Sequence, residues 1–371
     1  MKENFLENTK RIVIKIGSSL LIKKDEFNSI WLQNFIEDII FLKKNKTEIL
    51  IVTSGAVSLG KKYLKLDKKK LKINEKQACA ACGQVILMNN FKKSFAKKKI
   101  KVAQILLTYS DTEDRRKSLN SRETIFELLK YGTIPIINEN DTVATDELKF
   151  GDNDRLAARV SQIISADKLF LLSDVNGLYT KNPKINRDAR LIEKIDEIDE
   201  RHFKMAGSYT NAYGTGGMQT KIEAAKIATS AGCATVICNG GKKNPIKSFL
   251  SKYIGTLFLS KVRKESGFKK WLAGTIKVTG NLVIDDGARK AVIRGASILP
   301  SGIKKISGIF FKGDIIEVKD MSGNKLGKGV TYYDSEELKI IMGRKTAEIK
   351  KLLGYEGREE IIHRDYLTLN D

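Results

Sequence analysis

The stretch that decides the fold is Ile12-Val13-Ile14-Lys15-Ile16-Gly17-Ser18-Ser19, an apolar run broken only by a lysine and followed by a glycine and two serines. A run that is apolar on both faces is typical of a strand in a parallel sheet that is covered on both sides. Five further runs of this kind follow: Ile49–Val52, Val102–Leu107, Ile134–Ile137, Leu169–Leu172 and Thr235–Cys238. Helical patterns separate them: Ile30–Lys43, Gln77–Phe95, Ser121–Lys130 with a start at Asn120, Arg155–Ala166 and Thr220–Ala231. This alternation predicts an α/β fold with an open, mainly parallel sheet in an α/β/α sandwich.

From about residue 265 the pattern changes, and a chain of 371 residues is long enough for a second domain. Short runs that alternate polar and apolar residues lie between glycines: Gly274–Gly280, Leu282–Asp286, Gly308–Lys312 and Asp314–Val318. They predict a small, β-rich, barrel-like domain. We therefore expect a first domain at residues 1–260, a linker at 261–275, and a second domain with a C-terminal tail at 276–371.

The formal net charge of +23 would suit a nucleic-acid-binding protein. However, lysine is abundant along the whole chain, and runs such as Lys97-Lys98-Lys99 contain no aromatic residues that could stack on bases. We therefore interpret the charge mainly as solvated lysine surfaces. The sequence shows neither a signal peptide nor an apolar run long enough to span a bilayer, which predicts a cytoplasmic protein without a membrane partner.

The four cysteines do not indicate a disulfide scaffold or a zinc site. Cys79 and Cys82 form a CxxC, but no second CxxC or histidine pair completes a metal site. Their small-residue surroundings predict a closely packed helix. We interpret these two residues, Cys233 and Cys238 as structural thiols.

Polar clusters follow four of the predicted strands where each strand ends. They are Lys15–Ser19, Thr53-Ser54-Gly55, Asn138-Glu139-Asn140-Asp141 and Ser173-Asp174. Open α/β sheets bind their ligands outside the carboxyl ends of the strands, so this edge is the expected site.

The candidate chemistry at that edge concerns phosphate. The sequence lacks the glycine-rich P-loop and GxGxxG motifs, but Lys15 stands directly before the glycine-serine loop. A second loop, Gly214–Met218, leads into a helix that carries Lys221. Glycines let the backbone approach an anion, and a helix N-terminus offers it free N–H donors. The segments Asn138–Asp141 and Gly151-Asp152-Asn153-Asp154 would suit turns if taken alone, but beside a phosphate site they favour ligand and Mg²⁺ roles.

Taken together, these motifs resemble the glutamate 5-kinases, a branch of the amino acid kinase family. The resemblance rests on Ile14–Ser19, Val52–Ala56, Ile137–Asp141, Gly151–Asp154 and Gly214–Lys221, and it extends to about Phe258. The remainder is similar to the PUA domain that many members carry, through Asp285–Ala288, Leu299–Ile303 and Gly313-Asp314.

The resemblance implies ATP-dependent phosphorylation of the glutamate side-chain carboxylate, the first step of proline synthesis. It assigns catalytic roles to Lys15, Lys221 and Asp154, and glutamate binding to Ser54, Asn138, Asp141 and Asn153. The implied nucleotide-binding residues are Lys15, Gly17, Ser18, Ser173, Asp174, Thr215, Gly216, Gly217, Met218, Gln219, Thr220 and Lys221. Mg²⁺ would accompany ATP, and no protein ligand to the metal is assigned. The implied partners are further copies of the chain in a dimer or tetramer, proline as a feedback inhibitor, and a glutamyl phosphate reductase.

Two alternatives remain at this stage. The first is another amino acid kinase, for instance one that acts on aspartate. The β-rich second domain argues against it, because aspartate kinases usually carry α/β regulatory domains. The second is an RNA-binding protein that uses the PUA domain, which we keep as a secondary property because the kinase motifs are complete.

Overall fold

The computed structural model describes residues 5–23, 26–66, 70–143, 153–207, 217–261 and 278–369. The chain divides into two compact units, one made of residues 1–114 and 120–267, the other of residues 115–119 and 268–371. Of the predicted linker, only Lys261 lies within the described residues.

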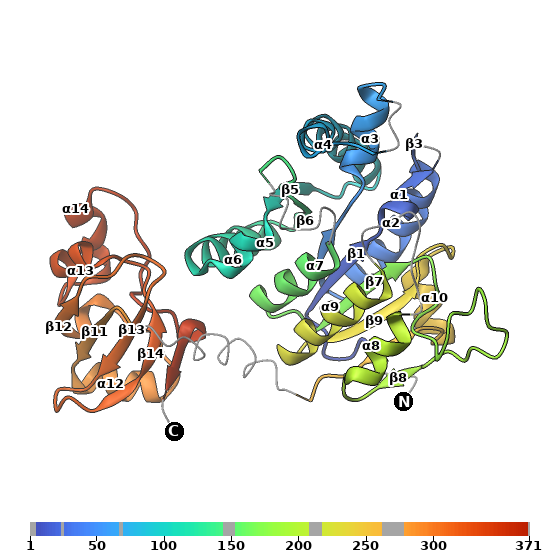
Figure 1. Ribbon diagram of the computed structural model, residues 1–371. Helices are drawn as coiled ribbons and strands as arrows, with labels where there is room; N and C mark the ends of the chain where they lie inside the picture. Colours follow the sequence, from blue (N-terminus) through green and yellow to red (C-terminus); the bar gives the residue numbers. More distant parts are fainter. Residues whose placement is uncertain are drawn as a thin grey trace. The chain divides into compact units, whose positions relative to one another are not determined.

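The first unit is built on an eight-stranded sheet with the order β5-β6-β4-β1-β7-β9-β10-β8 (Figure 1). Its strands are β1 (Arg11–Ile16), β4 (Glu48–Val52), β5 (Val102–Leu107), β6 (Ile134–Glu139), β7 (Lys168–Ser173), β8 (Lys194–Ile195), β9 (Ala234–Asn239) and β10 (Thr256–Phe258). Neighbouring strands are parallel except β10, which runs antiparallel to β9. The prediction of a mainly parallel α/β sheet is confirmed.

Helices cover both faces of this sheet, as the strands with two apolar faces require. On one face Ile12, Ile14 and Phe170 pack against α2 (Ser29–Lys44), α4 (Ile73–Ala96) and α10 (Pro245–Lys252). On the other face Val13 and Leu171 pack against α6 (Arg115–Lys130), α7 (Asn153–Ile163), α8 (Glu200–Gly207) and α9 (Met218–Ser230). The shorter elements of this unit are α1 (Ser18–Leu21), β2 (Ile22–Lys23), β3 (Glu26–Phe27), α3 (Ala56–Tyr63) and α5 (Tyr109–Glu113).

The predicted start of one helix at Asn120 is wrong, because α6 begins at Arg115. Asn120 lies inside the helix, where its carbonyl accepts a hydrogen bond from the Thr124 hydroxyl at 2.9 Å. The first turn, Arg115-Arg116-Lys117-Ser118, carries no apolar residue. Its sequence therefore gives no helical periodicity by which the true start could be recognised.

The small-residue stretch around Cys79 packs closely, as predicted. A Cβ on Gly83 would lie 1.7 Å from the carbonyl oxygen of Ala56, and one on Gly60 would lie 1.7 Å from that of Cys79. Helices α3 and α4 therefore approach each other at positions where only glycine fits. All four cysteines are free thiols, and Cys82 alone is not buried.

The second unit contains a five-stranded sheet with the order β12-β11-β13-β14-β15. The strands are β11 (Gly280–Ile284), β12 (Ile303–Gly308), β13 (Ile315–Lys319), β14 (Lys325–Val330) and β15 (Leu367–Leu369). The pairing is antiparallel except between β11 and β13. Among the described residues of this unit, the sheet is accompanied by the α-helices α12 (Asp286–Ile293), α13 (Ser335–Ile341) and α14 (Ile349–Leu353), together with short 3-10 turns at Pro300–Gly302, Thr346–Glu348 and Arg364–Tyr366.

The predicted strand Gly308–Lys312 is wrong. Strand β12 ends at Gly308, whose φ of +92° is a left-handed conformation that suits glycine, and Phe310 is then fully buried in the core. The predicted run Gly274–Gly280 lies mostly outside the described residues. The end of the run Leu282–Asp286 opens helix α12, because the Asp285 carboxylate accepts a hydrogen bond from the backbone N–H of Ala288 at 2.8 Å.

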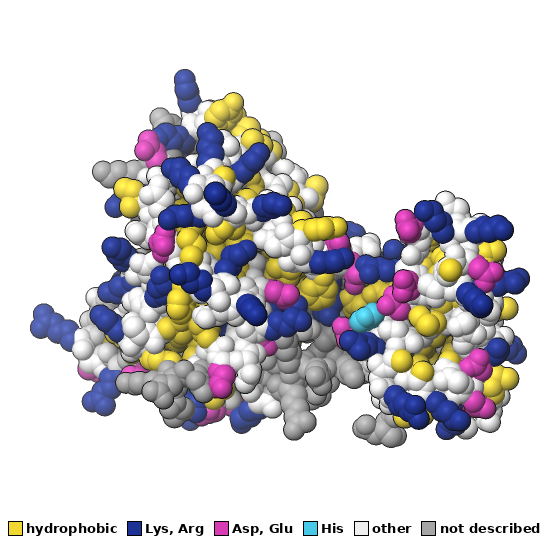
Figure 2. Space-filling model, turned by 180° about the vertical axis from the view of Figure 1, so that it is seen from behind, with side chains coloured by type: hydrophobic (Ala, Val, Ile, Leu, Met, Phe, Trp, Pro, Cys, Tyr) yellow, Lys and Arg dark blue, Asp and Glu magenta, His cyan; other side chains and the backbone are white. Residues whose placement is uncertain are grey.

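Positive charge is spread over the surface of both units. Figure 2 shows lysine and arginine side chains scattered across the visible face of each unit instead of gathered in one patch. Within the described part of the chain, no helix is both long and apolar enough to cross a membrane.

Candidate active site

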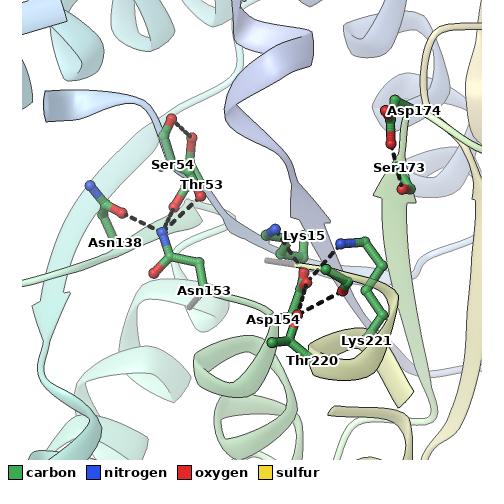
Figure 3. Close-up of polar contacts among 11 residues, drawn as sticks. Lys15, Thr53, Ser54, Asn138, Asn153, Asp154, Ser173, Asp174, Thr220 and Lys221 are labelled. Atoms are coloured by element: carbon green, nitrogen blue, oxygen red, sulfur yellow. Dashed lines mark hydrogen bonds and ion pairs between the residues drawn. The ribbon is translucent and has the colours of Figure 1, made fainter. Parts of the chain in front are cut away.

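A buried cluster of three charged side chains lies at the carboxyl edge of the first sheet (Figure 3). The Asp154 carboxylate receives the Lys15 ammonium on one oxygen at 2.7 Å and the Lys221 ammonium on the other at 2.9 Å. Its side chain is 1% exposed, and the two lysine side chains are 7% and 8% exposed. The three residues come from β1, α7 and α9, so the cluster depends on the assembled fold.

The charges of this cluster leave a net positive centre. Burial alone would raise the pKa of Asp154, but the two ammonium groups outweigh burial and hold that pKa well below its usual range. The carboxyl group is therefore ionised at any working pH. Two buried ammonium groups that share one carboxylate still attract a further anion.

The start of helix α9 adds to the same centre. Gly217 is the N-cap residue, and the Thr220 hydroxyl lies 2.9 Å from its carbonyl and 3.3 Å from Asp154. Free N–H groups and the positive end of the helix dipole therefore lie beside Lys221. Met218 is buried and Gln219 is exposed. The predicted residues Thr215 and Gly216 lie outside the described residues, as do Gly214, Gly151 and Asp152.

An ion pair fixes the two helices that supply Asp154 and Lys221. The next residue of α7, Arg155, donates from Nε to the Glu223 carboxylate on α9 at 2.7 Å. The pair is more than one-third exposed, so its free-energy contribution is small. It nevertheless links the first turn of α7 to the second turn of α9.

A second cluster consists of uncharged amide and hydroxyl groups (Figure 3). The Asn153 amide nitrogen contacts the Thr53 carbonyl at 2.6 Å, the Ser54 hydroxyl at 2.8 Å and the Asn138 amide oxygen at 3.0 Å. Asn153 is adjacent in sequence to Asp154 at the start of α7, so the two clusters share one helix terminus. The structure therefore places three of the four predicted glutamate-binding residues together.

Asp141, the fourth, lies just beyond β6 and is 8% exposed. Burial raises the pKa of its carboxyl group to about 6.

The remaining predicted nucleotide-binding residues lie at the ends of β7 and β1. Ser173 ends β7, and its hydroxyl lies 3.3 Å from the Asp174 carboxylate, apart from the charged cluster in Figure 3. Gly17 is the N-cap of α1, and Ser18 is its first residue. Strands β6, β4, β1 and β7 are neighbours in the sheet, so their polar ends share one edge.

Sequence reasoning missed two contributors to the amide cluster. The Thr53 backbone carbonyl anchors Asn153, and the Gln84 side chain on α4 accepts a hydrogen bond from the Asn138 amide nitrogen at 2.8 Å. Thr53 stands in a polar cluster that the sequence does show. Gln84 is one of several polar residues in α4, and no sequence motif distinguishes it from the others.

This arrangement suits the transfer of a phosphoryl group. Transfer requires aligned reactants and positive charge around the equatorial phosphate oxygens, which the two lysines and the helix N-terminus supply. The described residues contain no group of three or more His, Cys, Asp or Glu side chains that could hold a metal ion. Mg²⁺ commonly binds through nucleotide phosphates and water with few protein ligands, so it would enter as part of a Mg²⁺–ATP substrate.

Comparison with known proteins gives matches in both units. Residues 10–239 match the family model for the amino acid kinase family, and residues 280–353 match that for the PUA domain. The glutamate 5-kinase of Pelagibacter ubique is 50% identical over 362 residues, which cover 97% of this chain and 98% of that protein. The glutamate 5-kinase of Paramagnetospirillum magneticum is 46% identical over 366 residues, covering 98% and 99%. Among solved structures, the UMP kinase of Ureaplasma parvum aligns with 68% of this chain and 99% of its own at 19% identity and a TM-score of 0.48.

Proposed function

This chain belongs to the amino acid kinase family, and we propose that it transfers the γ-phosphoryl group of ATP to the side-chain carboxylate of L-glutamate, giving L-glutamyl 5-phosphate and ADP. The observation that carries the proposal is the Lys15–Asp154–Lys221 cluster, which joins a net positive, buried centre to the amide cluster at the start of α7. The names of the nearly full-length relatives favour glutamate as the acceptor. They do not favour aspartate, the alternative that the sequence left open.

The reaction needs no general base. The glutamate side-chain carboxyl group has a reference pKa of about 4.3, so at neutral pH it is already the nucleophile. Lys15 and Lys221 would neutralise charge on the phosphoryl group as it moves, and Asp154 would hold the two ammonium groups in place. Ser54, Asn138, Asp141 and Asn153 would hold glutamate, while Ser173, Asp174, Gly17, Ser18 and the loop before α9 would hold the nucleotide.

The test is ATP consumption by the purified protein with Mg²⁺ and one of glutamate, aspartate, acetylglutamate, UMP or no acceptor. With hydroxylamine present, we expect ADP release and hydroxamate formation with glutamate alone, because hydroxylamine traps an acyl phosphate. Turnover with a different acceptor would keep the family and refute the substrate. A folded protein that binds ATP but turns over no acceptor would favour the RNA-binding alternative, which a filter-binding titration against salt would then examine.

The product sets the partners that we propose. An acyl phosphate hydrolyses and cyclises readily, so a reductase that consumes glutamyl phosphate is the expected next enzyme. This role would make proline the end product and a feedback inhibitor at the glutamate site, in an enzyme that assembles as a homo-oligomer. We place the enzyme in the cytoplasm, where ATP and glutamate are available.

One prediction concerns Asp141 and pH. We propose that its carboxylate supplies the negative charge opposite the α-ammonium group of glutamate. Because the pKa of Asp141 is raised to about 6, protonation below that pH would remove this charge. At saturating Mg²⁺–ATP we expect KM for glutamate to be constant above about pH 7 and to rise up to tenfold per unit below about pH 6.

The matched variant is Asp141→Asn, which keeps the size of the side chain and cannot ionise. Its KM for glutamate should be high and should lose the inflection near pH 6. An inflection that persists in this variant would assign the titration to another group and contradict the role of Asp141.

A further inference from the structure

Four amide side chains form one line of hydrogen bonds that ends at the proposed glutamate site. The Gln84 amide nitrogen on α4 donates to the Gln104 oxygen on β5 at 3.0 Å. The Gln84 oxygen accepts from the Asn138 nitrogen on β6 at 2.8 Å, and the Asn138 oxygen accepts from the Asn153 nitrogen on α7 at 3.0 Å. The line thus crosses four elements, from an exposed edge strand to the start of the helix that carries Asp154.

The donor and acceptor roles along this line of hydrogen bonds are fixed by a group that can only accept. The Thr53 carbonyl oxygen can only accept, so the Asn153 side chain must turn its nitrogen towards it, at 2.6 Å. The Asn138 oxygen must then face Asn153, and the Asn138 nitrogen must face α4. Gln84 completes the order by offering an acceptor to that nitrogen, at a position that is 9% exposed.

The consequence appears at the other atom of Asn153. Its amide oxygen is buried and has no hydrogen-bond partner among the described residues. Buried polar atoms in folded proteins are nearly always paired, so an acceptor held in this way indicates a donor from a ligand. Within the proposed substrate, the α-ammonium group is the donor, whereas its two carboxylates can only accept.

We propose that Gln84 is a positioning residue for the amino-acid substrate: by accepting from Asn138, it holds the Asn153 amide oxygen as the acceptor for the substrate's α-ammonium group. The inference rests on the proposed function, because it takes the amide cluster as the glutamate site. These hydrogen bonds fix one orientation of the four amides, and among their four amide oxygens only that of Asn153 is left without a partner.

The backbone explains how a residue of α4 reaches this site. Gly83, next to Gln84, lets α4 touch the carbonyl of Ala56, where any side chain would clash. Ala56 is the first residue of α3 and follows Ser54-Gly55 directly. The same glycine contact therefore sets the distance from Gln84 to the loop that carries Ser54.

The test compares Gln84→Met with Gln84→Glu. Methionine keeps the length and removes the acceptor, so the Asn138 N–H is left unpaired. We expect KM for glutamate to rise about tenfold, with kcat and KM for ATP within about twofold of the wild type. In Gln84→Glu, the new carboxylate side chain keeps an acceptor oxygen for the Asn138 N–H. The exposed Gln104 can turn its amide nitrogen towards the other carboxylate oxygen. Gln84→Glu should therefore keep KM for L-glutamate within about threefold.

A second readout separates positioning from a structural defect. Glutarate has both carboxylates of L-glutamate but lacks the α-ammonium group. Its inhibition constant should be the same in Gln84→Met and in the wild type within about twofold, because it makes no bond to the Asn153 oxygen. Asn90→Leu is the matched control. It removes a half-buried amide elsewhere on α4, one that donates to the Ile86 carbonyl at 2.9 Å, and should change none of these constants.

The outcomes are distinct. A KM for L-glutamate within twofold of the wild type in Gln84→Met would overturn the inference. So would a parallel rise in the glutarate constant, or an equal loss in Gln84→Glu. If Gln84→Met does not fold, Gln84→Leu carries the same comparison. A wild-type protein that forms no hydroxamate from L-glutamate would refute the proposed function itself, whereas an active wild type without these shifts would refute only the role of Gln84.

Discussion

Replacing Lys221 by alanine is expected to lower kcat at least about 100-fold while KM for glutamate changes little. The Lys221 ammonium lies 2.9 Å from Asp154 beside the N-terminus of α9, where an anion would bind. Charge that develops on the phosphoryl group during transfer would lose one of two buried positive partners. Glutamate would still meet the amide cluster, in which Asn153 contacts Thr53, Ser54 and Asn138.

The measurement is steady-state kinetics with each substrate varied in turn, together with the thermal midpoint of each variant. Lys226→Ala is the matched control, because Lys226 lies on the same helix and is exposed. It should behave as the wild type. A Lys221→Ala enzyme with near-normal kcat would remove Lys221 from the catalytic machinery. A loss that appears only in KM for ATP would assign it to ground-state binding.

The charged cluster is easier to predict from the sequence than the amide cluster, for a physical reason. Lys15 stands at the end of an apolar strand and Lys221 follows a glycine-rich loop, so each is marked by its local surroundings. The contact of both lysines with Asp154 depends on the tertiary structure, because it requires β1, α7 and α9 to be assembled. From the sequence, only the resemblance to a family implies this contact.

The elements were predictable to the extent that their apolar pattern was regular. The run Leu169–Leu172 lies within β7, because these four residues are buried and apolar. The predicted helix start at Asn120 is wrong, because the first turn of α6 is charged and carries no apolar periodicity. In the second unit Phe310 alternates as a strand residue would, yet it follows a left-handed glycine and turns into the core. Gln84 could not have been found, since its partner lies 54 positions away and the contact depends on a close approach of α3 and α4.

The second large effect is expected for Asp154→Asn, which keeps the size of the side chain and removes its charge. Lys15 and Lys221 would then lose the buried carboxylate that both ammonium groups contact. Removing one partner of a buried ion pair typically costs about 3–5 kcal/mol, so the free energy of unfolding of the ligand-free protein should fall by roughly that amount. We also expect kcat to fall at least about 100-fold, because nothing would then hold the two ammonium groups in the orientation that transfer requires.

Binding of ATP should restore part of the lost stability of Asp154→Asn. The phosphates of ATP carry the negative charge that the variant lacks, and a ligand that binds only the folded state raises its stability. The shift in thermal midpoint on adding Mg²⁺–ATP should therefore be larger in Asp154→Asn than in the wild type, although turnover is lower. Binding and catalysis would separate in one variant, as expected if Asp154 orients the lysines and does not itself attract the nucleotide.

Asp38→Asn is the matched control for the loss of a buried carboxylate outside the charged cluster. Asp38 is a fully buried carboxylate in the same unit, and it accepts hydrogen bonds from the backbone N–H groups of Ile246 and Lys247 at 2.9 and 3.2 Å. Its replacement should lower stability without changing the size of the shift that ATP produces. An equal ATP shift in Asp154→Asn and the wild type would mean that the two ammonium groups do not face the nucleotide phosphates. The catalytic centre would then have to be sought elsewhere on the same sheet edge, at the ends of β6 and β7.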